Sequence, residues 1–329
     1  MAKVILLSCI KKGSKNTRYL IKYNGEFASV KLSTDQFYEL GSEIEVEDNK
    51  INEKKEYNPN WEKTLSVWTN NKRNVLKHLS NYKRNILGIT EDGFWEDKDG
   101  NKYYYSHILP EGTEDENIIK SAYTESIKKT KEKYKSEIHR GFKNLNSSQA
   151  FAFNFFQPII DNNLFSELIS TVKNVIDLEY EKKNHDETQF DFYIKDDNQE
   201  YSFEVKYTED DFGSAPMDSS HEAKWKTIYK DKMKNILKTE MTCEEFLDEY
   251  QLWRNILFAT EGMEVRFVFP KFREDLTEKV NNAKKQCNED IKKKIDIIYV
   301  DTFVSKMKES NDENLRKHYS EFERKYLPF

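Results

Sequence analysis

The first 48 residues alternate between apolar and polar side chains in the way that β-strands do. Four such segments cover residues 3–10, 17–23, 26–32 and 42–48. Asn24 and Gly25 separate the second segment from the third, and both residue types tolerate a positive φ, so they predict a hairpin. A short helical pattern over 33–40 precedes the last strand. We therefore predict a small β-rich module over residues 1–57.

The next region, residues 58–135, mixes helical patterns with one hairpin signal. Apolar residues recur at helical spacing over 60–90, and two aromatic-rich segments flank a turn at Asp99-Gly100. A charged helical pattern then runs over 114–141. The pattern predicts a middle region of helices and one hairpin.

Residues 136–329 show a regular alternation of helices and strands. A helix capped by serines begins near residue 147 and is predicted to break at Pro158. Helical patterns also cover 221–260, 272–294 and the C-terminal end. The predicted strands are 172–181, 189–194, 201–207, 265–269 and 295–300. The order predicts an α/β domain in which a mixed central sheet is covered by helices on both faces.

Composition excludes several classes of protein. Of the 329 residues 37% are hydrophobic and 14% aromatic, too many large apolar groups for a disordered chain. No run of about 18 apolar residues occurs, so no membrane-spanning helix is expected. Cys9, Cys243 and Cys287 lie far apart, which argues against a disulfide framework or a zinc ribbon and favours a reducing cytoplasm.

The net charge of −6 hides an uneven distribution. Residues 1–90 carry an excess of six basic side chains, and no acidic residue lies between Glu62 and Glu91. Such a stretch can bind phosphate even on an acidic protein, because the local field decides the contact. The candidates for DNA contacts are Lys72, Arg73, Lys83 and Arg84. An ordinary solvated helix face explains the same pattern equally well.

The candidate chemistry lies on two of the predicted strands. Glu204 and Lys206 alternate with Phe203 and Val205, and Asp191 lies between two phenylalanines on the preceding strand. Two carboxylates and a lysine suit phosphodiester hydrolysis, since carboxylate oxygens bind Mg²⁺ and an ammonium group offsets charge on the phosphate. An acid-x-lysine triplet alone is nonspecific in so charged a chain. The alternative is a sheet edge with salt-bridged charges.

The order of elements around these residues resembles the PD-(D/E)xK nuclease superfamily, and its restriction-endonuclease-like branch most closely. The resemblance covers about residues 136–300 and rests on NLNSSQAFAFNFFQP, FDFYI, FEVKYTEDDFG and YQLWRNILFA. It implies that Asp191 and Glu204 bind the metal, with the Val205 carbonyl as a further ligand, and that Lys206 is the catalytic lysine. The implied cofactor is Mg²⁺, for which Mn²⁺ would substitute. Gln-Phe precedes Asp191 where proline is often found in the superfamily.

Four further residues have two interpretations each. Many members of the superfamily add an acid or glutamine from the first helix, and Gln149 is the candidate here, although it would equally serve as a capping or packing residue. Glu209, just after the lysine, would either take a second metal ion or be a solvated loop charge, and the second interpretation is favoured. Gln251 and Arg254 lie one helical turn apart and would face either the site and DNA or solvent.

The sequence thus predicts a Mg²⁺-dependent endonuclease that hydrolyses double-stranded DNA in restriction or phage defence. Residues 136–329 would form the nuclease domain, and the middle region would help to hold DNA. A homodimer is expected if both strands are cut. Two alternatives remain open: a catalytically silent DNA-binding or adaptor protein on the same fold, and an RNase or DNA-end-processing nuclease.

Overall fold

The chain divides into two compact units in its computed structural model, which describes residues 1–12, 16–24, 26–33, 38, 43–53, 67–96, 100, 102–184 and 188–329. The N-terminal unit comprises residues 1–117 with 143–145 and 328. The C-terminal unit comprises residues 118–142, 146–327 and 329.

The N-terminal unit begins with an antiparallel five-stranded sheet in the order β4-β1-β2-β3-β5. Its strands are β1 (Ala2–Lys12), β2 (Asn16–Tyr23), β3 (Glu26–Ser33), β4 (Glu43–Val46) and β5 (Ile51–Glu53). The predicted β2–β3 hairpin is confirmed, and Asn24 has the positive φ, 49°, that its turn requires. Strand β5 was not predicted; it follows a single 3₁₀ turn, Asp48–Lys50, in a polar segment. Most of the short helix predicted over 33–40 lies outside the described residues.

The same unit contains the helix and hairpin predicted for the middle region. Helix α2 spans Val67–Asn85, and the antiparallel hairpin pairs β6 (Gly93–Glu96) with β7 (Lys102–Tyr105). The predicted start of the helix near residue 60 lies outside the described residues. Gly93 is required by packing, since a Cβ there would come within 2.0 Å of the Leu109 carbonyl oxygen.

The prediction of one long charged helix over 114–141 is wrong. The chain instead forms 3₁₀ turns at Glu114–Asn117, Lys135–Glu137 and Arg140–Lys143 around a shorter helix, α3 (Thr124–Lys133). Before α3, the backbone N–H of Ile119 donates to the side-chain oxygen of Asn154, so a tertiary bond replaces a helical one. The Thr124 hydroxyl group then accepts from the N–H of Ser121 and ends the irregular segment.

The C-terminal unit is built on a mixed sheet in the order β12-β11-β10-β9-β8. Its strands are β8 (Val175–Lys183), β9 (Gln189–Asp196), β10 (Glu200–Val205), β11 (Glu264–Phe269) and β12 (Ile295–Tyr299). Strands β8, β9 and β10 form an antiparallel meander, and β11 and β12 join parallel to β10 after helical connections. The predicted mixed α/β sheet is confirmed.

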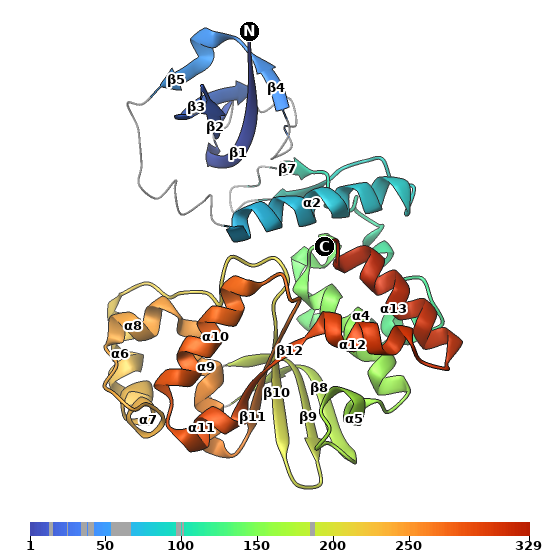
Figure 1. The fold of residues 1–329 in the computed structure, drawn as a ribbon, viewed down its shortest axis with the longest axis vertical. Helices are drawn as coiled ribbons and strands as arrows, with labels where there is room; N and C mark the ends of the chain where they lie inside the picture. The colour runs from blue at the N-terminus through green and yellow to red at the C-terminus, as the bar shows by residue number, and fades with distance from the viewer. Residues whose placement is uncertain are drawn as a thin grey trace. The chain divides into compact units, whose positions relative to one another are not determined.

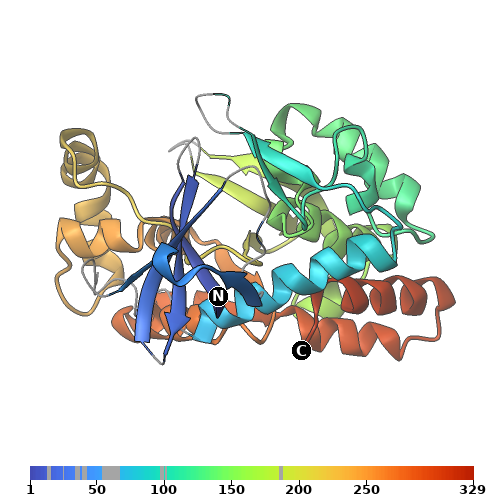
Figure 2. The same ribbon diagram turned by 90° about the horizontal axis from the view of Figure 1, so that it is seen from above.

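Helices cover both faces of this sheet (Figure 1). The helices of this unit are α4 (Ser148–Asp161), α5 (Phe165–Leu168), α6 (Ser219–Lys224), α7 (Lys230–Ile236), α8 (Cys243–Asp248), α9 (Tyr250–Leu257), α10 (Glu274–Gln286), α11 (Glu289–Lys294), α12 (Val300–Lys308) and α13 (Glu313–Tyr326). A π-helical turn, Trp225–Tyr229, joins α6 to α7, and a 3₁₀ turn, Phe258–Glu261, follows α9. The single final helix of the prediction is in fact the pair α12 and α13, which lie side by side in Figure 2.

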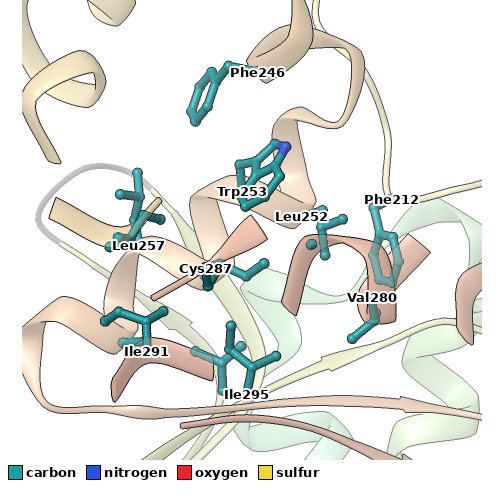
Figure 3. Packing of buried hydrophobic residues seen from close by; sticks show 14 of the residues in the cluster. Phe212, Phe246, Leu252, Trp253, Leu257, Val280, Cys287, Ile291 and Ile295 are labelled. Carbon is teal, nitrogen blue, oxygen red and sulfur yellow. The ribbon is translucent and has the colours of Figure 1, made fainter. Parts of the chain in front are cut away.

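The face of the sheet beneath α9 and α10 is closed by one large hydrophobic cluster (Figure 3). Leu252, Trp253 and Ile256 of α9 pack there with Val265 and Phe267 of β11, all almost completely buried. This packing holds α9 rigidly over the sheet, which matters because α9 also carries polar residues toward the strands.

Pro158 does not break the first helix as predicted. Helix α4 continues through it to Asp161, with Ser147 as its N-cap and a bond from the N–H of Ala150 to the Ser147 side chain. Proline has no N–H to donate to the carbonyl of Asn154, four residues earlier. Nε2 of His318 on α13 donates to that carbonyl instead, at 2.8 Å. A tertiary bond therefore replaces the helical bond that proline removes.

In the part of the chain that the structure describes, no helix is both long and apolar enough to cross a membrane.

Candidate active site

Strands β9 and β10 separate at the end that carries the acidic residues. Their ladder ends at the pair Phe203–Phe192. One residue further, Oδ2 of Asp191 accepts a hydrogen bond from the backbone N–H of Val205 at 2.6 Å, so a side chain continues the pairing of the strands. Asp191 precedes Phe192 and Glu204 follows Phe203, so in this antiparallel pair they lie opposite each other on the same face of the sheet.

The predicted alternation of β10 is confirmed. The Phe203 ring lies 5.4 Å from that of Phe156 on α4, so it faces α4. Glu204 and Lys206 form side-chain hydrogen bonds with α9, which covers the opposite face. The apolar and charged residues of the strand are therefore separated as the period of two requires.

Glu204 and Lys206 form a buried ion pair. Nζ of Lys206 lies 2.9 Å from Oε1 of Glu204, and the two side chains are 10% and 1% exposed. Nζ of Lys206 also donates to Oε1 of Gln251 at 2.8 Å, and Nδ2 of Asn255 donates to Oε2 of Glu204 at 3.0 Å. Apart from the ion contact, Oε1 of Glu204 is a buried atom without a hydrogen bond. It is therefore the atom of this carboxylate that a cation would find available.

The environment of Asp191 disfavours its charged form. Burial raises its pKa well above the ordinary value, and the neighbouring carboxylates of Glu204 and Glu181 raise it further. Lys206 and the N–H of Val205 lower it, with smaller effect. Three acidic groups thus share a region of low polarity, where a bound cation would relieve their repulsion.

Lys206 remains an ammonium ion at neutral pH. Burial alone would lower its pKa, but the carboxylates of Glu204, Glu209 and Asp191 act more strongly in the opposite direction and raise it above the ordinary value. Lys206 is accordingly suited to stabilise negative charge and not to accept a proton.

Glu181 at the end of β8 is the acidic neighbour that sequence reasoning missed. It is 6% exposed and adopts a φ of 53°, a left-handed conformation unusual for glutamate. Its carboxylate accepts from Nε2 of Gln149 at 2.6 Å and from Nε2 of Gln189 at 2.9 Å. The pairs Tyr180–Phe192 and Lys182–Phe190 of β8 and β9 place Glu181 beside Asp191, and the sequence alone carries no signal for this register.

The structure places Gln149 next to the acidic residues, with both ends of its amide occupied. Nε2 donates to Glu181 and also to the carbonyl of Glu137 at 2.9 Å. Oε1 accepts from the backbone N–H of His139, also at 2.9 Å. Gln149 therefore acts on Asp191 indirectly, through Glu181. The side-chain carbonyl oxygen of Gln149 already accepts from the backbone N–H of His139.

Arg254 and Glu209 contact other groups of the protein. A guanidinium nitrogen of Arg254 donates to the Thr188 hydroxyl group at 2.6 Å, and the guanidinium carbon lies 5.0 Å from the centre of the Tyr250 ring. Glu209 accepts from the backbone N–H of Tyr207 at 2.8 Å, which makes it a residue that shapes the loop after β10. Of the two α9 residues considered from sequence, Gln251 is the one that contacts Lys206.

Among the basic residues of α2, Lys83 does not form part of a surface. Its side chain is completely buried, and its ammonium group lies 2.7 Å from Oδ1 of Asp92 and 2.6 Å and 3.1 Å from the carbonyls of Glu91 and Ile108. These bonds attach the helix to the segments before and after the β6–β7 hairpin. The prediction that Lys83 contacts DNA is corrected on this ground, because a buried ammonium with three oxygen partners has no access to a phosphate.

The other predicted DNA contacts in α2 are more accessible. Arg84 is 40% exposed and lies 3.7 Å from Oδ1 of Asp92, and Lys72 and Arg73 are half-buried. They belong to the N-terminal unit, whereas the acidic residues and Lys206 belong to the C-terminal unit.

The residues of the site fit a Mg²⁺ ion. Within the described ranges, no group of three or more His, Cys, Asp or Glu side chains is arranged as a metal-binding cluster. Mg²⁺ does not need one, because it keeps several waters and binds through one or two carboxylates. Asp191 and Glu204 supply two carboxylates, and the buried Oε1 of Glu204 has only the Lys206 ion contact.

Fold and site together define a mixed α/β protein with a buried acid-acid-lysine cluster at the separated ends of two strands. The family model described as "Restriction Endonuclease associating with ARP" matches residues 76–327, well over half of the chain. The chain therefore belongs to this restriction endonuclease family, and the predicted relation to restriction endonucleases is confirmed at that level. Searches of curated proteins and of solved structures return no match.

Proposed function

We propose that this protein is a Mg²⁺-dependent endonuclease that hydrolyses DNA with a PD-(D/E)xK-type site. The observation that carries the proposal is the arrangement of Asp191, Glu204 and Lys206, in which two carboxylates of adjacent strands lie beside a buried ammonium group. The order of α4, β8, β9, β10, α9 and β11 supports it, since it follows the helix, three strands, helix and strand that the resemblance implies.

In this proposal Asp191 and Glu204 hold the metal. The Val205 carbonyl would assist, because the N–H and C=O of one strand residue point the same way and the N–H of Val205 points to Asp191. A bound Mg²⁺ would act as a Lewis acid on the phosphate and lower the pKa of a bound water. The neutral amide of Gln149 keeps Glu181 in place beside Asp191.

Lys206 would act on the phosphate by charge. Its raised pKa keeps it protonated, so its ammonium group can offset the negative charge that develops on the phosphate oxygens in the transition state. Gln251, which accepts from the same ammonium group, keeps the lysine pointed to the site.

The substrate proposed is double-stranded DNA, cut by a homodimer whose two-fold symmetry addresses both strands. The family supports DNA as the substrate class. A cytoplasmic role in restriction or phage defence is the biological setting that follows from this proposal.

The test is incubation of the purified protein with supercoiled plasmid, linear duplex, single-stranded DNA and RNA, each with Mg²⁺, Mn²⁺ or EDTA. Linearisation of the plasmid with Mg²⁺ and not with EDTA is the expected result. Asp191→Ala should lose this activity, whereas Asp177→Ala, which removes an exposed acid of β8, should retain it. Binding without cleavage would identify a silent DNA-binding protein, and cleavage of RNA or of DNA ends alone would identify the other alternative.

A further inference from the structure

Helix α9 carries a polar pair on an otherwise apolar face. Gln251 and Asn255 are four residues apart, so their side chains lie one above the other. Asn255 is 1% exposed and lies between Trp253 and Ile256, which are part of the large hydrophobic cluster. Asparagine is a poor helix former, and a buried amide is costly unless it is hydrogen-bonded. Its presence here is explained by what it contacts.

Each amide presents the group that its partner requires, Glu204 in β10 or Lys206 directly after it. Nδ2 of Asn255, a donor, bonds to Oε2 of Glu204 at 3.0 Å, and Oε1 of Gln251, an acceptor, bonds to Nζ of Lys206 at 2.8 Å. Nδ2 of Asn255 also donates to the backbone carbonyl of Gln251 at 3.1 Å, which fixes the orientation of the amide. The donor of Asn255 thus meets the carboxylate, and the acceptor of Gln251 meets the ammonium group.

The geometry points to Asn255 and Gln251 as positioning residues for the reaction, Asn255 through Glu204 and Gln251 through Lys206. This inference rests on the proposed function. Asn255 holds one carboxylate oxygen of Glu204 and leaves Oε1 for a metal ion. Oε1 is also the atom that contacts Lys206, so a metal that binds there displaces this contact. Gln251 is then the partner that keeps the ammonium group beside the site.

The two residues therefore have separable effects. Loss of the Asn255 donor frees the Glu204 carboxylate to rotate, which weakens metal binding. Loss of the Gln251 acceptor leaves the carboxylates in place and misplaces the lysine, which lowers kcat more than it changes metal affinity or KM for DNA. Residues that orient metal ligands in this way change affinity or activity by roughly 10–100-fold when they are replaced.

The experiment compares Asn255→Leu with Asn255→Gln and Gln251→Leu with Gln251→Glu in the full chain. Each conservative variant retains the required donor or acceptor. Leucine has a similar volume but neither a donor nor an acceptor. Asn282→Leu is the matched control, because it removes an exposed amide from the middle of α10. Binding of Mn²⁺ is measured by titration calorimetry. Values of kcat and KM are measured on plasmid DNA, and folding is checked by thermal unfolding.

We expect Asn255→Leu to weaken Mn²⁺ binding by about tenfold or more, with Asn255→Gln in between. Gln251→Leu should bind Mn²⁺ as the wild type does, with kcat reduced by about tenfold or more, and Gln251→Glu should retain more activity than Gln251→Leu. A purely packing role predicts the reverse ranking, with leucine better tolerated than the polar residue inside an apolar core. That ranking, or variants that behave like Asn282→Leu, would overturn the inference. If the wild type itself neither binds Mn²⁺ nor cuts DNA, the proposed function fails instead.

Discussion

The backbone N–H of Val205 donates to the carboxylate of Asp191 at 2.6 Å, just beyond the last ladder pair of β9 and β10. A side chain thus takes the place of a backbone acceptor where the two strands separate. The carboxylate is thereby fixed beside Glu204, although the two groups repel each other. This repulsion destabilises the metal-free protein, so removal of one of the two charges should raise its free energy of unfolding.

Asp191→Asn should separate stability from metal binding. The amide oxygen still accepts from Val205, but one of the crowded charges is gone. Because the raised pKa of Asp191 shows that the folded state disfavours its charge, the free energy of unfolding without metal should increase at pH 8. The increase in melting temperature that Mn²⁺ produces in the wild type should be lost. Thermal unfolding with and without Mn²⁺ measures both.

The control for this prediction is Asp177→Asn, an exposed carboxylate on β8. It should change neither the stability without metal nor the response to Mn²⁺. A metal-free Asp191→Asn protein that is less stable than the wild type would show that the carboxylate contributes more through its hydrogen bond than it costs through repulsion.

Lys206→Ala should abolish cleavage and also destabilise the fold. It removes the cation that should act in the transition state, and it leaves the buried carboxylate of Glu204 without its counter-ion. We expect a loss of roughly 3 kcal/mol in the free energy of unfolding, measured by urea denaturation, and no cleavage of plasmid. DNA affinity in EDTA should change little, because the task of the lysine lies in the transition state.

Lys195→Ala is a suitable comparison, since Lys195 pairs with Glu200 on the same two strands but at the surface. Its stability and cleavage rate should stay close to those of the wild type. If Lys206→Ala cuts DNA at the wild-type rate, the catalytic role assigned to Lys206 is wrong.

Much of the C-terminal unit could be predicted because its strands are short apolar segments with a clear period of two. The alternation of Phe203, Glu204, Val205 and Lys206 was enough to place the charged residues on one face. What the pattern could not show was which long-range partner each element would find. Inside α4, at Pro158, it is His318, far away in sequence, that supplies the missing donor to the Asn154 carbonyl.

The same limit applies to the site. Glu181 ends a predicted strand, but its approach to Asp191 depends on the register of β8 and β9. Asn255 looks like any polar residue in a helix until Glu204 is placed beneath it. Lys83 looked like part of a basic surface because its three oxygen partners, two of them backbone carbonyls, carry no sequence signal.

His318 should make the protein sensitive to acid. It is completely buried between Ser121 and the Asn154 carbonyl, and burial lowers its pKa to about 4 from the ordinary 6.5. The folded state therefore keeps the ring neutral, while the unfolded chain takes up a proton below pH 6.5. Stability that is present above pH 6.5 should be lost as the pH falls toward 4, by about 3 kcal/mol in all. Urea denaturation at a series of pH values measures the slope.

His318→Gln provides the comparison, because it removes the titrating group while it retains polar atoms for the same partners. This variant is expected to be less stable at pH 7 and to lose less stability on acidification. An unchanged slope between pH 6.5 and 4.5 would mean that another group, such as His107 with its similarly lowered pKa, dominates the acid response.

Lys72, Arg73 and Arg84 are basic residues of α2 that are more accessible than the buried Lys83. Replacement of Lys72, Arg73 and Arg84 by glutamine should weaken DNA binding on all sequences alike. Each phosphate contact that is lost releases one counterion fewer, so the slope of log K against log salt should fall by roughly one unit per contact. Affinity is measured in EDTA over a range of salt concentrations, so that cleavage does not interfere.

Two comparisons make this prediction specific to α2. Glutamine at Lys285, Lys292 and Lys293, on α10 and α11, removes the same number of positive charges elsewhere and should leave the slope unchanged. Lys83→Gln should act differently again: it removes a buried cation from three oxygen atoms and should lower stability without a change in the salt slope of the folded protein. If the triple variant of α2 binds with unaltered affinity and slope, that face of α2 is an ordinary solvated surface, and the C-terminal unit must hold the DNA.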